Sequence, residues 1–270
     1  MAREPLRVGL AGLGAVGLEV AQRIEAGIPG LTLAAIAVRD QDKARRNLPS
    51  AGDRIPFISA EALAQSCDVV VECLPPKLFR RVASSAIERG KIFMPLSVGQ
   101  LLENWDLVTR AKETGARILV PTGALIGLDA VRAAAEGTIR SATMITRKPP
   151  GGLDGAPYLV QRGISVKNLQ EPLKVFDGTA REGARGFPEN VNVAAALSLA
   201  GIGPDRTRLE IWADPALQRN THRIEVDADT ASFCMSIENV PSENPKTGRI
   251  VALSTVAALR GLVAELKVGT

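Results

Sequence analysis

Aromatic residues and histidine are scarce in this sequence, and it has no long apolar run. Phe, Trp and Tyr together make up 3% of the 270 residues, too few for a surface that stacks on exposed nucleic-acid bases. No apolar run approaches the ~18 to 20 residues that cross a bilayer. The opening MAREPLRVGLAGLG lacks the charged, apolar and small-residue succession of a secretory signal. We therefore expect a soluble, cytoplasmic protein with no membrane partner.

Cysteine is also rare. Cys67, Cys73 and Cys234 never form a C-x-x-C pair, and a single histidine cannot complete a thiolate and imidazole cage for zinc. We expect reduced, buried cysteines and no metal site. The net charge of +4 comes from Lys and Arg scattered among acids. This pattern argues against nucleic acid and suits an anionic cofactor or substrate.

The first half of the chain alternates buried strands with helices. Strands are predicted at 6–14, 31–38, 67–74, 91–97 and 116–121, and helices at 15–30, 41–48, 78–90 and 99–115. Parallel neighbours need crossover connections, which are normally helical. The pattern predicts a doubly wound, Rossmann-type parallel sheet of the α/β class, forming a dinucleotide-binding domain over residues 1–122.

The second half of the chain has a different pattern of apolar and polar residues. After a helix at 124–137, strands are predicted at 138–148, 208–214, 222–229 and 231–240, with alternating apolar and polar residues. This predicts a second, α+β domain over 123–243 with a mixed or antiparallel sheet. The Gly- and Pro-rich segments 148–159 and 176–190 are predicted to be loops near a site or lids. A helix over 249–266, within a segment 244–270, closes the chain.

A G-x-G-x-x-G motif follows the first strand and opens its helix. In this context the first glycine permits the turn, the second lets backbone approach a pyrophosphate, and the third lets helix and strand pack closely. The helix N-terminus adds free N–H donors. The motif predicts an NAD or NADP site formed by Gly12, Gly14, Ala15, Val16 and Gly17.

Two further segments belong to the expected cofactor site. Asp40, after the second strand, is in the region where an acidic residue accepts hydrogen bonds from the NAD ribose, and Arg39 can instead accept the 2′-phosphate of NADP. Alternatively, the two residues only cap the next helix. Leu74 and Pro75, in CLPP, are expected at the carboxyl edge of the sheet, where prolines can fix a wall.

The second half resembles a known family. PTGALIGLDAV, TRKPP, FPENVNVAAALSLAGIGPDRT, WADP…RNTHRIEV and NPKTGRIVALSTVAALR are similar to L-aspartate dehydrogenases, which feed pyridine nucleotide biosynthesis. The resemblance runs in order along nearly the whole chain. It implies oxidation of L-aspartate to iminoaspartate or oxaloacetate plus ammonia, with NAD or NADP as cofactor. It also implies a homodimer formed through the second domain, and a final helix that returns to the nucleotide domain, as in the similar dihydrodipicolinate reductases.

The same resemblance implies three site residues. The backbone N–H of Ala124 and the side chain of Asn190 would contact the nicotinamide end of the cofactor, and His222 would be the catalytic residue. Ala124 is expected to begin a helix, where free N–H groups occur. Asn190 precedes an apolar helix, so it is alternatively an N-cap.

His222 is the only histidine, and the alternation of RNTHRIEV places it with Ile224 and Val226 on the inward face of a strand. An imidazole with its ordinary pKa of ~6.5 suits a base that deprotonates the substrate ammonium and assists water addition to the imine. Without the resemblance, a plain strand histidine is the simpler interpretation. Lys148 is an alternative base, and Arg147 and Lys148 are candidates to bind the substrate carboxylates, as are backbone groups near Asn192.

Two other functions fit the same features. One is an NAD(P)-dependent reductase of another small imino or keto acid on the same architecture. The other is a non-catalytic, dinucleotide-sensing protein, which has no need of an inward-facing imidazole.

Overall fold

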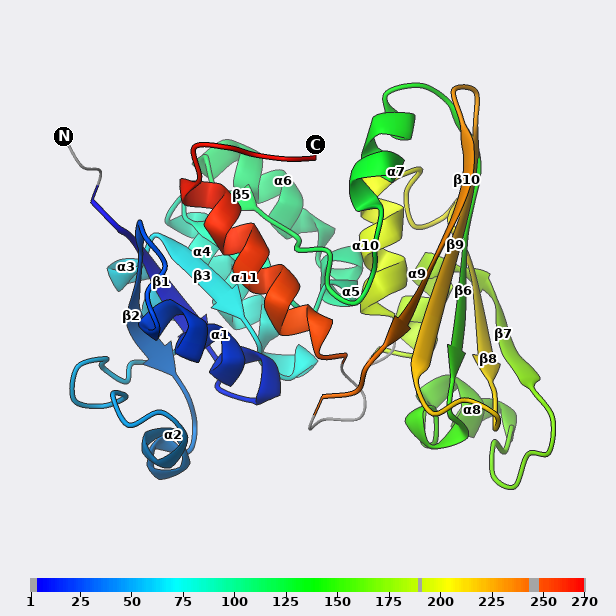
Figure 1. The fold of residues 1–270 in the computed structure, drawn as a ribbon, viewed down its shortest axis with the longest axis horizontal. Coiled ribbons are helices and arrows are strands. Elements are labelled where there is room, and N and C mark those ends of the chain that lie inside the picture. Colours follow the sequence, from blue (N-terminus) through cyan, green and yellow to red (C-terminus); the bar gives the residue numbers. More distant parts are fainter. Residues whose placement is uncertain (1–3, 189–190, 243–247, 270) are drawn as a thin grey trace. The chain divides into compact units, whose positions relative to one another are not determined.

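The computed structural model describes residues 4–188, 191–242 and 248–269. The chain forms two compact units, one made of Met1–Pro121 with Val251–Lys267 and the other of Thr122–Ile250 with Val268–Thr270. We call them unit 1 and unit 2, and Figure 1 labels their elements. Within the described ranges, no helix has both the length and the apolar character needed to cross a membrane.

Unit 1 is built on a five-stranded sheet whose order is β2-β1-β3-β4-β5. All neighbouring strands are parallel. The strands are β1 (Leu6–Ala11), β2 (Leu31–Ala37), β3 (Val69–Glu72), β4 (Ile92–Pro95) and β5 (Arg117–Ile118). The predicted doubly wound α/β sheet is therefore confirmed. The strand order reverses at β1: β2 lies on one side of it and β3, with the later strands, on the other. Parallel sheets bind ligands at such a switch point.

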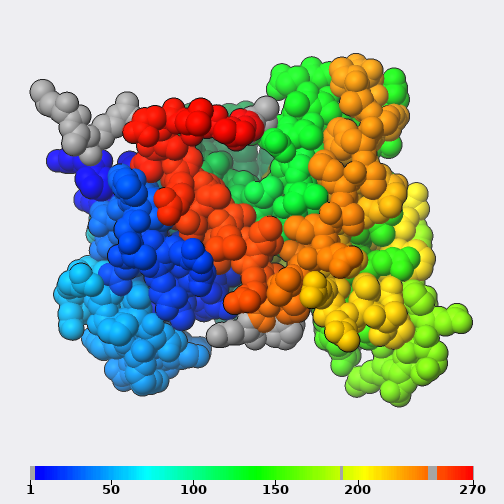
Figure 2. Space-filling view, viewed as in Figure 1, coloured from blue at the N-terminus to red at the C-terminus, as the bar shows by residue number. Residues whose placement is uncertain are grey.

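Helices cover both faces of this sheet. They are α1 (Ala15–Glu25), α2 (Gln41–Asn47), α3 (Leu63–Ser66), α4 (Phe79–Glu88), α5 (Gly99–Glu103), α6 (Trp105–Thr114) and α11 (Ile250–Val263), with a 3-10 turn at Pro76–Leu78. Residues of α1 and α11 join β1 and β3 in one buried cluster, and Figure 1 shows both helices in front of the sheet. On the other face, the Phe79 ring of α4 meets the Phe93 ring of β4 at 5.7 Å. The outer side of α11 forms part of the surface seen in orange-red in Figure 2.

Unit 2 contains a mixed five-stranded sheet whose order is β10-β9-β6-β8-β7. Its strands are β6 (Ile139–Lys148), β7 (Leu173–Thr179), β8 (Arg208–Ala213), β9 (Asn220–Ala228) and β10 (Ser232–Asn239). β6 runs parallel to β8 and antiparallel to β9. Its helices are α7 (Leu128–Ala135), α8 (Pro157–Arg162), α9 (Ala180–Gly186) and α10 (Asn192–Ala200), with a 3-10 turn at Pro150–Gly152. Figure 1 shows α7, α9 and α10 on one face of the sheet, so the predicted second sheet with one covered face is confirmed.

Some local predictions were wrong. The segment 176–190 was expected to be a loop, but it contains the end of β7 and all of α9. Thr179 and Glu182 form a capping box, in which the Thr179 hydroxyl accepts from the Glu182 N–H and the Glu182 carboxylate accepts from the Thr179 N–H. The expected helix over 99–115 is two helices separated at Asn104. Of the cysteines, Cys67 is buried, Cys73 is half-buried and Cys234 is exposed, so buried cysteines were predicted correctly only in part.

Candidate functional site

The glycine turn, Gly12–Gly17, joins β1 to α1 in a form that only small residues allow. Gly12 has a φ of 104°, and a Cβ on it would lie 2.5 Å from the carbonyl oxygen of Cys73. A Cβ on Gly17 would collide with the carbonyl oxygen of Gly12. Around Gly14, by contrast, no described atom lies within 4 Å of the place where a Cβ would be. The turn is thus packed against the protein at two glycines and open at the third.

The open glycine lies at the N-terminus of α1. Ala15 and Val16 are the first helical residues, and the first intrahelical bond runs from the Leu18 N–H to the Gly14 carbonyl at 2.8 Å. Helix α1 is fully described, and neither a side-chain cap nor an acidic residue occupies its first turn. The N–H groups of that turn therefore remain available to an anion, and the open space at Gly14 fits the approach of a dinucleotide pyrophosphate.

Arg39 and Asp40 follow β2 and are both exposed. Asp40 is the N-cap of α2, because its Oδ1 accepts from the Lys43 N–H at 2.9 Å. Asp40 therefore does cap α2, as the alternative interpretation expected of it. A carboxylate has further acceptor sites, so this role is compatible with a ribose contact.

The segment Cys73–Pro76, which we call the proline turn, follows β3. Leu74 is half-buried and Pro75 is exposed. The Cys73 N–H donates to the Ala11 carbonyl at 2.8 Å, so the proline turn starts directly beside the glycine turn. The glycine turn and the proline turn, which both carry predicted cofactor residues, are therefore neighbours at the carboxyl edge of the sheet.

Ala124 does not begin a helix, contrary to our prediction. It lies in a turn closed by a 3.3 Å bond from the Leu125 N–H to the Thr122 carbonyl. Gly123 and Gly127 have φ values of 66° and 72°, and this left-handed backbone delays the start of α7 to Leu128. The Asn239 amide of β10 donates to the Ala124 carbonyl at 3.1 Å. Asn190, the other residue expected at the nicotinamide, lies outside the described residues.

His222 lies on β9 opposite Thr146 of β6. Both side chains are buried, and Thr146 Oγ1 is 3.1 Å from His222 Nδ1. Lys148, two residues beyond Thr146, points to the same face of the sheet and is also buried. We call these three residues the His222 cluster. The inward orientation of His222 agrees with the alternation of RNTHRIEV.

The environment of His222 differs from the expectation of an ordinary pKa. Burial, and secondarily the charge of Lys148, lowers the pKa of His222 to about 3. The imidazole is therefore neutral near pH 7. With one ring nitrogen engaged by Thr146, the other nitrogen is the group that can exchange a proton.

Arg147 lies on the opposite face of β6 from the His222 cluster. Its guanidinium pairs with Asp214 at 3.0 Å and stacks 4.9 Å from the Trp212 ring. The structure thus separates the two basic residues of TRKPP and brings only Lys148 to His222. Thr146 was missed by sequence reasoning, although its position two residues before Lys148 in an alternating strand was a usable signal.

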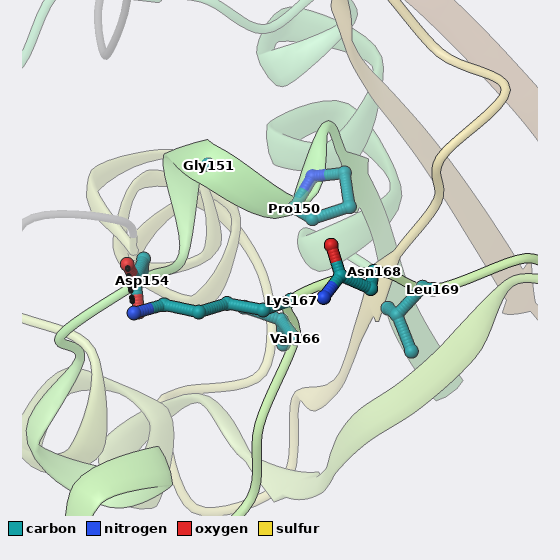
Figure 3. Close-up of a pocket in the computed structure, with 7 residues that line it drawn as sticks. All are labelled: Pro150, Gly151, Asp154, Val166, Lys167, Asn168 and Leu169. Atoms are coloured by element: carbon teal, nitrogen blue, oxygen red, sulfur yellow. Dashed lines mark ion pairs between the residues drawn. The ribbon is translucent and has the colours of Figure 1, made fainter.

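A hollow of about 320 Å³ lies beside the 3-10 turn that follows Lys148. Figure 3 shows the side chain of Lys167 extended toward Asp154. Its Nζ lies 3.9 Å from Oδ2 of Asp154. The described residues that line the hollow do not include the His222 cluster. Within the described ranges there is also no group of three or more His, Cys, Asp or Glu side chains that could hold a metal ion.

Comparisons with known proteins address both units. Residues 12–121 match a family model described as the NAD binding domain of homoserine dehydrogenase, and residues 129–262 match one described as the C-terminal domain of aspartate dehydrogenase. The first match agrees with the expected NAD or NADP cofactor. The crystal structure of aspartate dehydrogenase from Thermotoga maritima shares the fold, with a TM-score of 0.75, 20% identity and coverage of 98% of this chain and 99% of that one.

Relatives of higher identity carry one name. The L-aspartate dehydrogenase of Bradyrhizobium diazoefficiens is 55% identical over 269 residues, which cover 100% of this chain and 96% of the relative. The L-aspartate dehydrogenase of Methanosarcina mazei is 38% identical, with 98% and 100% covered. Identity at this level over full length confirms the resemblance inferred from the motifs: the chain belongs to the L-aspartate dehydrogenase family of oxidoreductases.

Proposed function

We propose that this protein oxidises L-aspartate with NAD+ or NADP+ and water, giving oxaloacetate, ammonium, NADH or NADPH, and a proton. The observation that carries the proposal is the His222 cluster, in which a buried neutral imidazole and a buried ammonium share one face of a sheet. This combination suits an anionic substrate whose own ammonium must lose a proton. The relatives named above supply the substrate, which the cluster alone does not specify.

We assign the cofactor to unit 1. The glycine turn, with Ala15 and Val16, would hold the pyrophosphate through backbone N–H groups. Asp40 would hold the adenosine ribose, Arg39 would favour a 2′-phosphate, and Leu74 with Pro75 would line the site. Ala124 and Asn190 of unit 2 would contact the nicotinamide end. A bound nicotinamide supplies the hydride acceptor.

His222 is the proposed base. Thr146 Oγ1 lies 3.1 Å from its Nδ1. We assign the tautomer in which Nδ1–H donates to that hydroxyl, because it leaves the lone pair of Nε2 for the substrate ammonium. Removal of that proton frees the nitrogen electron pair to assist departure of the hydride from Cα, and iminoaspartate results. The same imidazole then assists the addition of water, which releases ammonium and leaves oxaloacetate.

Lys148 is proposed to bind a substrate carboxylate. Burial is the main cause of the lowered pKa of His222, and the charge of the Lys148 ammonium is the second cause. A bound carboxylate would offset that charge, so protonation of the imidazole becomes easier when substrate is present. The His222 imidazole would thus become more basic when the substrate, which carries the proton to be removed, is bound.

We further propose that unit 2 forms a homodimer through the face of its sheet opposite the helices, and that the enzyme acts in the cytoplasm to feed NAD biosynthesis. The support for the dimer is the composition of that face, where Arg147 and Lys174 both lie over the Trp212 ring. Light scattering on the purified protein tests it, and a monomeric mass at micromolar concentration would refute it.

A steady-state assay tests the activity. L-Aspartate with each cofactor should give NADH or NADPH, and a panel of other amino acids should give far less. Turnover of another amino acid with none on aspartate would favour the alternative imino or keto acid reductase. Cofactor binding with no turnover of any substrate would favour the dinucleotide-sensing alternative.

A further inference from the structure

Glu72, the last residue of β3, is an acidic side chain completely removed from solvent; burial raises its pKa, and the hydrogen-bond donors around it oppose that rise. Among the described residues of unit 1 it is the only charged side chain in the buried class. Removing a carboxylate from water is costly unless hydrogen bonds replace the lost hydration. Its position therefore requires a specific set of partners.

Those partners come from two segments, the proline turn after β3 and the residues that follow β4. Glu72 Oε1 accepts from the Leu74 N–H at 2.8 Å and from the Ser97 hydroxyl at 3.1 Å, and Oε2 accepts from the Ser97 N–H at 3.1 Å. The Ser97 hydroxyl also lies 3.3 Å from the Leu74 carbonyl oxygen. No basic side chain is among the described partners of this carboxylate. Backbone N–H groups and one hydroxyl hold it instead.

The carboxylate therefore joins two segments at the carboxyl edge of the sheet. Leu74 belongs to the proline turn, and Ser97 follows β4. The proline turn in turn contacts the glycine turn, because the Cys73 N–H donates to Ala11 and the Cys73 carbonyl fills the space that a Gly12 side chain would need. A substitution at Glu72 should therefore alter the backbone position of both the proline turn and the glycine turn, to which we assign the cofactor.

We propose that Glu72 is a positioning residue for the dinucleotide site: it holds the proline turn and Ser97 in the arrangement in which the glycine turn can receive the cofactor. This proposal rests on the proposed cofactor site of unit 1. A carboxylate is needed because both of its oxygens accept hydrogen bonds. Glutamine has the same shape but presents an NH2 group toward a donor, so at least one bond is lost.

Direct titration with NADH, followed by its fluorescence, tests the proposal without turnover. We expect Glu72→Gln to weaken the Kd for NADH about tenfold, which corresponds to losing one hydrogen bond to a charged group. Ser97→Ala should weaken it about threefold to tenfold, and Ser97→Thr should restore most of the affinity because it keeps the hydroxyl. Glu88→Gln, at an exposed position of α4 in the same unit, is the matched control and should leave the Kd unchanged.

Two further measurements separate positioning from simple loss of stability. At saturating cofactor, the KM for L-aspartate in Glu72→Gln should stay within about twofold of the parent. An unchanged Kd in folded Glu72→Gln, even with a lowered Tm, would overturn the proposal. If Glu72→Gln does not fold, Ser97→Ala decides: a weakened Kd supports positioning and an unchanged Kd overturns it.

A separate variant distinguishes failure of the proposed cofactor site at the glycine turn from failure of the positioning role of Glu72. Gly14→Val fills the open space of the glycine turn, so it should abolish NADH binding if the cofactor lies there. Tight binding in Gly14→Val would overturn the cofactor site itself. Lost binding in Gly14→Val together with an unchanged Kd in Glu72→Gln and Ser97→Ala would overturn the positioning role alone.

Discussion

Glu72 of unit 1 and His222 of unit 2 are both buried ionisable groups, but their surroundings differ. In unit 1, Glu72 lies where three strands end, and hydrogen-bond donors from two neighbouring segments surround it. In unit 2, His222 and Lys148 lie on the covered face of a sheet, and the one described hydrogen bond of the imidazole engages only Nδ1. A carboxylate surrounded by donors holds backbone in place. An imidazole with one ring nitrogen outside that bond can exchange a proton, and burial keeps it neutral near pH 7.

The largest effect should come from removing the imidazole. We expect His222→Ala to lower kcat by about 10² to 10⁴, the range for loss of a general base, while the Kd for NADH changes little. Arg223→Ala, an exposed neighbour on the same strand, is the matched control. Parent-like turnover in His222→Ala would show that unit 2 holds its buried imidazole for structure alone, as unit 1 holds Glu72.

The next effect concerns Lys148. Replacing it with methionine keeps most of the side-chain volume but removes the charge. We expect the KM for L-aspartate to rise about tenfold to a hundredfold, as for loss of a charge-assisted bond to a carboxylate. Arg147→Met, on the opposite face, should raise it far less, and the reverse ranking would contradict the assignment of the two residues.

Acid should weaken the fold through His222. Its pKa is about 3 in the folded protein against an ordinary 6.5, so between these values the unfolded chain binds a proton that the folded chain does not. Stability therefore falls as pH drops through this window, by about 2 kcal/mol between about pH 7 and about pH 5. Urea unfolding of the parent and of His222→Asn should diverge in this way, and parallel curves would contradict the buried neutral imidazole.

A smaller effect is expected at Thr146. Thr146→Val keeps the shape but removes the oxygen that orients His222, so kcat should fall about tenfold. Thr146→Ser should retain most activity. The pH dependence of kcat is the distinguishing measurement, because loss of packing alone would leave its midpoint where it is in the parent.

The smallest effect should be at Arg39, which is exposed. Arg39→Ala is expected to weaken NADP binding about fivefold, in the range of an exposed charge pair, and to leave NAD binding unchanged. Equal changes for both cofactors would argue against a contact with the 2′-phosphate.

Much of the fold could be predicted from local patterns. The glycine turn and the β1 and α1 segments that flank it are encoded by residues close in sequence, so glycine spacing and helical periodicity were sufficient. Predictions failed where non-local structure intervenes. Left-handed glycines beside Ala124 delayed a helix that its apolar pattern favoured. The Gly-rich segment 176–190 formed the end of β7 because it pairs with β8, and it formed α9, whose N-terminus Thr179 caps.

By itself the sequence determined the fold class, the family, the glycine turn and the inward face of His222, because periodicity and motif depend on residues a few positions apart. Only the tertiary structure decided which polar groups meet. Thr146 and His222 are 76 positions apart, and Glu72 and Ser97 are 25 apart. Such contacts depend on strand register and on burial, which also sets the pKa of His222. A linear pattern shows which residues face inward but not what surrounds them there.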